Sequence, residues 1–345
     1  MANQEIKLRS RHLFVHKAIV NPDFNSSTVL TSDPWSYVSL YLQRSGTSKS
    51  RFLWTQASEF YSATKSLSPT AAPLTAYYCI LNATKALLVQ KNITFSPFHG
   101  CSGFNSSNNA SLSSEMVRFK TNGTLAGLSR YLGENDPNSL YSLKDLLYNM
   151  PFIHRAFVLT YTSCKELFIP LYLPRFVRKA NSSESWFCAN IQGGQYQSQH
   201  SINKLASDFE RDNGSPDTWT IRSKRRFKWK TDAASKKTNL TRLRNYHSRI
   251  RRHVVYINGK TRLWYIKRSN VSGWIPRYQL TMLFAASHRL SELARYAPDR
   301  LEKHFNCQHN WLLSEFVSLG LDQFVDQIAS EITGHDFMTT GLRAQ

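Results

Sequence analysis

The sequence predicts a mainly helical α+β protein in which N- and C-terminal helical segments form one bundle around a basic, strand-rich insertion. Apolar residues recur at helical spacing before residue 160 and after residue 276, whereas short β-branched and aromatic runs separated by Pro, Asn and Gly fill the middle. We therefore expect an N-terminal arm at 1–31, the first part of the bundle at 32–166, the insertion at 167–275 and completing helices at 276–345.

The stretch 73–91, PLTAYYCILNATKALLVQK, predicts the central helix of this bundle. Its larger apolar residues follow one helical face, while small residues such as Ala76 and Ala83 leave room for a neighbouring helix to pack closely. Lys85 lies one turn beyond Leu81 on the apolar side. A cation there is costly unless its head reaches water, a carboxylate or a phosphate, so Lys85 is a candidate anion ligand.

Helix-start patterns place further helices before and after this one. Asp33-Pro34 predicts a helix through WSYVSLYLQR, and a second helix is expected over about 51–66. Residues 93–116 are polar and predict a long loop that contains His99-Gly100. Ser142 and Asp145 predict a capping box for SLKDLLYNM, whereas FIHRAFVLTYTSC fits either helix or strand.

The insertion contains one clear hairpin pattern, and the C-terminal part returns to helices. In RHVVYINGKTRLWYIKR, Asn258-Gly259 predicts a two-residue turn between aromatic and β-branched runs. The segment YQLTMLFAASHRLSELARY predicts a helix that ends near Arg295. Pro298 and Asp299 suit the first turn of the next helix, and a further amphipathic helical segment closes the chain.

The charge of the chain indicates an acidic partner. Its formal net charge is +21, which favours nucleic acid, an anionic membrane or an acidic protein. There is no N-terminal apolar run and no long uncharged apolar stretch, so we expect a cytoplasmic protein without a membrane partner. The five scattered cysteines form no CxxC pair and predict neither a disulfide framework nor a zinc ribbon.

Two basic runs, IRSKRRFKWK at 221–230 and RLRNYHSRIRRH at 242–253, carry aromatic residues between their cations. This mixture suits phosphate contacts combined with stacking on nucleic-acid bases, although a solvated charged surface has the same composition. The predicted nucleic-acid-binding residues are Arg222, Lys224, Arg225, Arg226, Lys228, Trp229, Lys230, Arg244, Arg249, Arg251 and Arg252.

Two sets of residues are candidates for chemistry. Arg242 and His247 stand five residues apart, and a histidine that moves a proton beside an arginine that holds phosphate is able to cleave RNA without a metal. Phosphate contact alone is the simpler alternative for this pair. His99 is the second candidate, because it can join Lys85 and Arg295 around an anion pocket, with His99 and Arg295 as possible catalytic groups.

Other common sites are not indicated. The sequence contains no Walker loop, GxSxG, HExxH or GxGxxG motif, so we expect no cofactor. His304, Cys307 and His309 are ligand-type residues without a second half-site, and we expect ordinary packing at a helix end there and no metal.

Several motifs, taken in order, resemble the YaaC-like protein family over most of residues 35–330. They are FLWTQASEFYSATKS, YYCILNATKALL, His99-Gly100, YSLKDLLYNMPFIH and LSELARYAPD. The helical parts of that family are similar to HEPN domains, which are helical bundles that often dimerise and act as metal-independent RNases or as RNA-binding partners in defence and toxin systems. The resemblance implies a catalytic Arg and His four to six residues apart near the start of a bundle helix. Arg242 and His247 match that spacing but precede a hairpin in the insertion, and His304 lies too far from Arg295 to match.

These observations predict a nucleic-acid-binding, HEPN-like effector that binds RNA or DNA, with metal-independent endoribonuclease activity in an anti-phage or toxin system as the expected chemistry. One alternative is a non-catalytic adaptor or nucleic-acid-binding subunit of a complex. Another is a sensor of a small phosphorylated ligand. A protein partner or a homodimer is expected in either of the first two cases.

Overall fold

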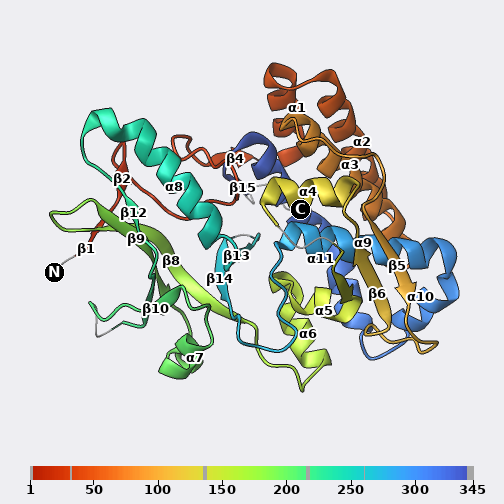
Figure 1. Cartoon of the computed structure of the whole chain (residues 1–345). Helices are drawn as coiled ribbons and strands as arrows, with labels where there is room; N and C mark the ends of the chain where they lie inside the picture. The colour runs from red at the N-terminus through yellow and green to blue at the C-terminus, as the bar shows by residue number, and fades with distance from the viewer. Residues whose placement is uncertain (1–2, 32, 135–137, 215–217, 260, 340–345) are drawn as a thin grey trace. The chain divides into compact units, whose positions relative to one another are not determined.

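The computed structural model describes residues 3–31, 33–134, 138–214, 218–259 and 261–339. Over these residues the chain is an α+β protein (Figure 1). It divides into two compact units: unit 1 comprises residues 1–29, 166–274 and 334–336, and unit 2 comprises residues 30–165, 275–333 and 337–345. The N-terminal arm thus folds together with the strand-rich middle of the chain.

An antiparallel sheet forms the body of unit 1, with the strand order β10-β11-β9-β8-β14-β13 and with β1 and β12 paired to β8 and β9. The pairing of β8 with β9 shifts its register between Tyr172 and Arg175, and such an irregularity bends a sheet. The strands are β1 (Asn3–Glu5), β8 (Phe168–Lys179), β9 (Glu184–Ile191), β10 (Phe209–Arg211), β11 (Thr220–Ser223), β12 (Phe227–Lys228), β13 (Val254–Ile257) and β14 (Leu263–Lys267).

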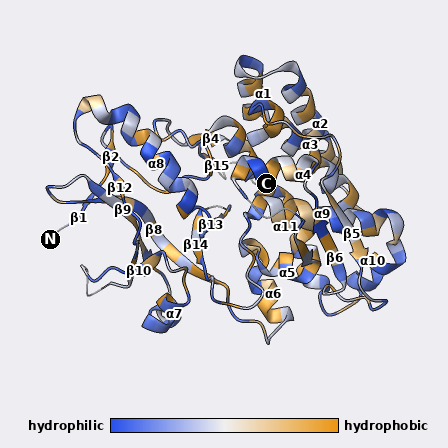
Figure 2. Cartoon of the chain, in the orientation of Figure 1, coloured by the Kyte–Doolittle hydropathy of each residue, from blue (hydrophilic) through white to orange (hydrophobic). Residues whose placement is uncertain are grey.

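The helix α8 (Lys236–Ile250) carries most of the second basic run and packs on this sheet. Leu243, Tyr246 and Ile250 belong to the same buried core as Phe176 and Phe187 of the sheet. The rest of α8 is largely hydrophilic (Figure 2). The other elements of unit 1 are β2 (Lys7–Leu8), β3 (Arg11–His12), η2 (Gly194–Tyr196), α7 (Gln199–Asn203) and η3 (Ala233–Ser235).

The predicted hairpin is present, but its predicted two-residue turn is wrong. Strands β13 and β14 pair from Val254↔Ile266 to Ile257↔Leu263, so residues 258–262 connect them. Asn258 instead accepts a hydrogen bond from the Nζ of Lys17 at 3.0 Å. Lys17 is fully buried, and a buried ammonium needs such a partner. The asparagine therefore serves a long-range contact that the local Asn-Gly pattern does not reveal.

Unit 2 is mostly helical. Its predicted helix starts at Asp33 and Ser142 are confirmed, because the Asp33 side chain accepts from the backbone N–H groups of Trp35 and Ser36, and Ser142 accepts from that of Asp145. The segment 152–164 that fitted either helix or strand is helical over most of its length. The helices are α1 (Pro34–Ser45), α2 (Ser48–Lys65), α3 (Ala72–Gln90), α4 (Thr124–Leu132), α5 (Leu143–Tyr148), η1 (Pro151–Ile153), α6 (His154–Thr160), α9 (Gln279–Tyr296), α10 (Pro298–Phe305) and α11 (Asn310–Thr333).

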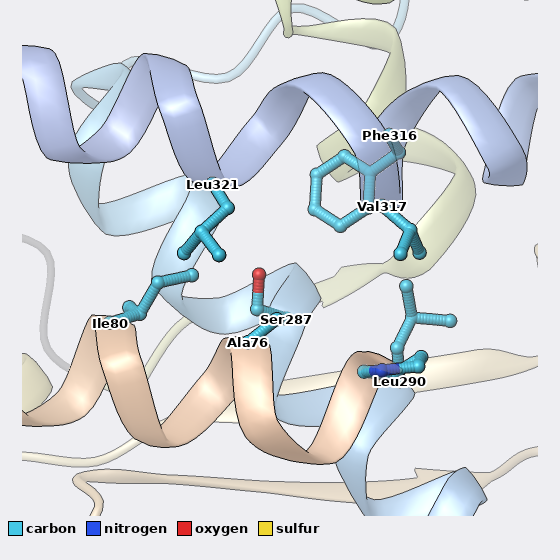
Figure 3. A pocket seen from close by; sticks show the side chains of 8 residues that line it. Ala76, Ile80, Ser287, Leu290, Phe316, Val317 and Leu321 are labelled. Carbon is cyan, nitrogen blue, oxygen red and sulfur yellow. The ribbon is translucent and has the colours of Figure 1, made fainter. Parts of the chain in front are cut away.

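The central helix predicted at 73–91 is confirmed as α3, which packs against α2, α9 and α11. Ala76 and Ala83 are buried, as close packing requires. Figure 3 shows Leu321 of α11 facing Ile80 of α3, with Ser287 of α9 beside them. The seam leaves a cavity of about 10 Å³, which has room for one water molecule at most, so it is a packing seam and not a ligand site.

The long polar loop predicted after residue 91 is partly wrong. It contains the hairpin of β5 (Cys101–Asn105) and β6 (Glu115–Phe119), which β7 (Leu140–Ser142) extends to three strands. The strand β5 is rich in Ser, Gly and Asn, which are depleted in strands, so tertiary pairing overrides its local propensity. A further two-stranded sheet pairs β4 (Val29–Thr31) with β15 (Phe337–Thr339).

Candidate functional site

The predicted pair Arg242 and His247 lies on α8 in unit 1, and the two side chains are placed differently. Arg242 is half-buried, whereas His247 is fully buried and its Nε2 accepts the backbone N–H of His16 at 3.1 Å. Burial and the charge of Arg251 hold the pKa of His247 well below its ordinary value. His247 thus anchors the N-terminal arm as a neutral ring that solvent does not reach.

The first basic run is exposed only in part. Lys224, Lys228 and Lys230 are exposed, whereas several arginines of the run are held by carboxylates. Arg222 bonds Glu210 at 2.8 Å, Arg225 bonds Asp208 at 2.7 Å and Arg226 bonds Glu184 at 3.0 Å. These ion pairs neutralise part of the charge that the sequence offers to nucleic acid.

The second basic run is divided in the same way. Arg249 and Arg252 are exposed, while Arg244 is half-buried and donates to the carbonyl of Pro22 at 3.2 Å. Arg251 is buried and donates to the carbonyls of Val254 and Lys17.

The aromatic residues of the two runs are core residues. Phe227, Trp229 and Tyr246 all belong to the buried cluster of unit 1. The expectation that Trp229 stacks on a base is therefore wrong for this conformation, because the core covers its ring. The exposed residues of the two runs are therefore mainly Lys and Arg.

The other predicted set, Lys85, His99 and Arg295, is brought together in unit 2. His99 and Arg295 line one open cavity of about 90 Å³, which we call the His99 pocket. Its charge environment includes Lys85 and Lys120, both close enough to lower the pKa of His99. The pocket is lined by Leu74, Tyr77, Tyr78, His99, His288, Ser291, Glu292, Arg295 and Tyr296.

Two glycines fix the backbone that carries His99. Gly100 has φ +85° and Gly123 has φ +115°, both in the left-handed region that favours glycine. A Cβ on Gly123 would lie 2.4 Å from the Cα of Gly100, so the two chain segments touch there. The carbonyl of His99 accepts the N–H of Leu125 at 3.0 Å, and that of Phe98 accepts the N–H of Thr124 at 2.8 Å. The start of α4 thus holds His99 in place.

Tyr77 of α3 holds the ring of His99. The Tyr77 hydroxyl and His99 Nδ1 share a hydrogen bond of 2.6 Å, which leaves His99 Nε2 for other partners. The ring of Tyr77 also meets that of His288 edge-on at 5.0 Å between centroids. Burial raises the pKa of Tyr77 and lowers the pKa of His288 to about 3, so both groups are neutral at pH 7.

His99 is exposed and uncharged at neutral pH. Partial burial and the positive charges of Lys85, Arg295 and Lys120 lower its pKa, and Glu292 opposes them. Burial also lowers the pKa of Lys85. A neutral histidine beside several cations is able both to accept a proton and to bind an anion.

The carboxylate of the pocket, Glu292, is not a free charge. It accepts the N–H of Gly103 at 3.2 Å and lies 3.1 Å from a guanidinium nitrogen of Arg289. Arg289 bonds Glu115 as well, at 2.6 Å. Because Glu292 is engaged in this way, the cations around His99 leave the pocket with an excess of positive charge.

Glu115 is the centre of a buried network behind this pocket. It is fully buried and accepts hydrogen bonds from Arg289, from Arg300 at 2.5 Å and from His304 at 2.9 Å, while His304 also bonds His309 at 3.0 Å. Burial by itself would raise the pKa of Glu115, but its hydrogen bonds with His304, Arg300 and Arg289 lower it to about 2. The network fixes Arg289 and, through it, Glu292.

The sequence reasoning missed Tyr77, His288, Glu292, Lys120 and Glu115. One spacing indicates the first of them, since Tyr77, Leu81 and Lys85 recur at intervals of four on α3 and share one face of the helix. The others come from α9, from β6 and from Lys120 directly after β6, and nothing local in the sequence connects those segments to His99-Gly100.

His304 and His309 bond each other, and within the described ranges no group of three or more His, Cys, Asp or Glu side chains is placed to hold a metal ion. None of the helices in the described part of the chain is both long enough and apolar enough to cross a membrane.

The chain is thus an α+β protein whose helical unit carries a pocket surrounded by the charges of Lys85, Lys120 and Arg295. The chain matches the family described as YaaC-like Protein over residues 24–332 and belongs to that family. No curated protein and no solved structure matches it.

Proposed function

We propose that this protein binds RNA through phosphate contacts and cleaves it without a metal at the His99 pocket. One observation carries the proposal: a neutral, exposed histidine held by Tyr77 lies among the charges of Lys85, Lys120 and Arg295. A proton acceptor and several phosphate-binding cations are the groups that metal-independent RNA cleavage requires.

In the proposed reaction, His99 carries its own proton on Nδ1, which donates to the Tyr77 hydroxyl oxygen, and its Nε2 accepts the proton of the ribose 2′-hydroxyl, whose oxygen attacks the adjacent phosphorus. The cations stabilise the negative charge that develops on the phosphate oxygens. The 5′-oxygen leaves with a proton from solvent, which has access to this open pocket. The products are a 2′,3′-cyclic phosphate and a 5′-hydroxyl end.

Two exposed aromatic side chains favour nucleic acid over a free phosphate ion as the ligand. Tyr296 lines the pocket and Phe98 directly precedes His99, and each is 72% exposed. Aromatic faces beside a phosphate site are suited to stacking on unpaired bases, which contributes ~1–3 kcal/mol per base. The exposed lysines of unit 1 provide additional, sequence-independent phosphate contacts.

The proposal also includes the sequence-based expectations about the type of helical bundle, the compartment and the biological system. The helices of unit 2 are taken as an HEPN-like bundle, with His99 in place of the buried His247 as the acid–base residue. The protein is proposed to act in the cytoplasm, in an anti-phage or toxin system, with a protein partner or as a homodimer.

A non-catalytic adaptor is the second candidate function. It is favoured by the lowered pKa of His288, which makes that neighbouring ring a poor proton donor at neutral pH. In this case the His99 pocket binds a backbone phosphate and leaves it intact.

Cleavage of single-stranded RNA in EDTA separates these candidates. We expect cleavage by the wild type, a loss of ~10²–10⁴-fold in His99→Ala, and weaker RNA binding in Arg295→Ala. His200→Ala is the control, because His200 is an exposed histidine of unit 1 and its removal should change neither property.

The outcomes differ clearly. RNA binding that falls with salt, without any cleavage, supports the adaptor. Binding that is absent at low salt, or a His99→Ala variant as active as the wild type, contradicts the proposal.

A further inference from the structure

Unit 1 contains a larger cavity, distinct from the His99 pocket, that neither the family nor the proposed function explains. It has a volume of about 610 Å³ and lies among α7, β10 and the ends of β11, β13 and β14. This volume is within the range of ~300–1,000 Å³ that is typical of small-molecule sites. We call it the Lys224 pocket.

The charges at the Lys224 pocket favour an anionic ligand. Arg211 and Lys224 line it, and no ion pair joins either of them to a carboxylate in the described part of the chain. Arg211 stacks over the ring of Trp219 at 3.9 Å. The one lining carboxylate, Glu210, is occupied by Arg222 at 2.8 Å. The excess charge around the cavity is therefore positive.

The walls also provide apolar and neutral polar groups. Phe209 and Trp274 contribute aromatic surface, and Asn203 and Asn270 contribute amide groups. Such amides pair with the hydrogen-bonding edges of heterocyclic bases, and aromatic rings stack on their faces.

His253 adds a polar group whose hydrogen-bonding capacity is not used. It lines the pocket, and its ring meets Phe209 edge-on at 5.5 Å between centroids. Its Nδ1 is buried and has no hydrogen-bond partner among the described residues. Because this nitrogen is covered, His253 contributes the face and edge of its ring to the wall of the pocket. Burial lowers the pKa of His253 to about 4, so the ring is neutral at pH 7 and suits an uncharged part of a ligand.

The backbone around the pocket is held by hydrogen bonds from several elements. The N–H of Lys224 donates to the carbonyl of Asp208 at 2.7 Å, the N–H of Lys267 donates to that of His253 at 2.8 Å, and the N–H of Ser269 donates to that of Lys204 at 3.1 Å. The chain's own hydrogen bonds thus tie the walls together, as expected for a largely preformed site.

From these features we propose that the Lys224 pocket binds a nucleoside monophosphate, with the base against the aromatic and amide groups and the phosphate at Lys224 and Arg211. This site is independent of RNA cleavage at the His99 pocket, because its lining residues all belong to unit 1. It gives the protein a small-ligand site in addition to its RNA-binding surface.

Calorimetry with AMP, UMP, adenosine and inorganic phosphate tests the proposal on the full chain. We expect a nucleotide to bind more tightly than either of its parts. Lys224→Ala should weaken nucleotide binding about tenfold, the loss of one charge-assisted contact, and should leave adenosine binding unchanged. Asn270→Ala should weaken the binding of both the nucleotide and adenosine.

Two control variants locate the site. Lys228 is exposed in the same basic run but does not line the pocket, so Lys228→Ala should bind the nucleotide like the wild type. His99→Ala should also bind it normally, even if it abolishes RNA cleavage. Failure of cleavage together with normal nucleotide binding would overturn only the function proposed for the His99 pocket.

Three results would overturn the nucleotide site. They are no nucleotide binding at millimolar concentration, equal weakening by Lys224→Ala and Lys228→Ala, and binding of a short single-stranded RNA that Lys224→Ala weakens, without binding of any mononucleotide. The last result would identify the region as part of an RNA-binding groove.

Discussion

Replacement of Glu115 by Gln tests the buried network behind the His99 pocket. The substitution keeps the size of the side chain but removes the negative charge that Arg289, Arg300 and His304 share. The side-chain oxygen of the glutamine can still accept hydrogen bonds. Its NH2 group cannot, although it faces the N–H donors of the arginines. Breaking a buried ion pair costs ~3–5 kcal/mol, because a charge is left buried without compensation.

The structure indicates the lower end of this range. Arg289 keeps Glu292 as a partner at 3.1 Å, and Arg300 keeps the carbonyl of Asn109 at 2.7 Å. We therefore expect Glu115→Gln to lower the free energy of unfolding by ~3 kcal/mol, a large share of the ~5–15 kcal/mol of a typical domain. The control is Glu210→Gln, because the partner of Glu210, Arg222, is 32% exposed. This variant should lose less than ~1 kcal/mol of its free energy of unfolding.

Urea unfolding at several pH values measures both variants. The lowered pKa of Glu115, about 2 compared with 4.5 as its ordinary value, means that its contribution is present above pH 4.5 and lost as the pH falls toward 2. The difference between the wild type and Glu115→Gln should shrink over that interval. A loss no larger than that of the control at pH 7, or a difference that does not depend on pH, would refute the reasoning.

Two further predictions concern acid stability and the glycine beside His99. His16 and His288 have pKa values lowered to about 4 and about 3 by burial, so the unfolded chain binds their protons first. The free energy of unfolding should therefore fall by ~1.4 kcal/mol per histidine for each pH unit from 6.5 down to those values, and a urea midpoint that stays constant between pH 7 and pH 5 would contradict this. Gly100→Ala places a Cβ 2.9 Å from the backbone nitrogen of Leu125 at φ +85°. It should lower the free energy of unfolding by ~1–3 kcal/mol in a urea unfolding assay, and it should weaken RNA binding in a filter-binding assay. The Gly194→Ala control has open space around its Cβ and should change neither property.

The helices could be predicted from the sequence because their causes are local. Pro73 and the small residues of 73–91 specify a closely packed helix, and the capping side chains of Asp33 and Ser142 act within three residues of their own positions. Lys85, whose place on an apolar face was anomalous, belongs to the charge environment of His99. A charged residue on an otherwise apolar helical face therefore indicated where the pocket lies.

The remaining features depend on contacts between distant residues. The partners of Glu115 follow it by 174 residues for Arg289 and by 185 for Arg300, so no window of sequence contains the network. The strand β5 has a loop-like composition and forms only because β6 pairs with it. The hairpin connection likewise differs from the Asn-Gly pattern because Asn258 contacts Lys17.

The two candidate histidines show why spacing alone does not identify an acid–base residue. His247 and His99 both have lowered pKa values, and burial is the first cause for each. His247 is fully buried, so protonating it requires the core of unit 1 to open. His99 is exposed, and the cations that disfavour its protonation also attract an anion. A bound phosphate partly offsets those positive charges and raises the pKa of His99, so that binding and proton uptake favour each other. The histidine with the weaker sequence pattern is therefore the one whose ring can exchange protons with solvent without opening the core.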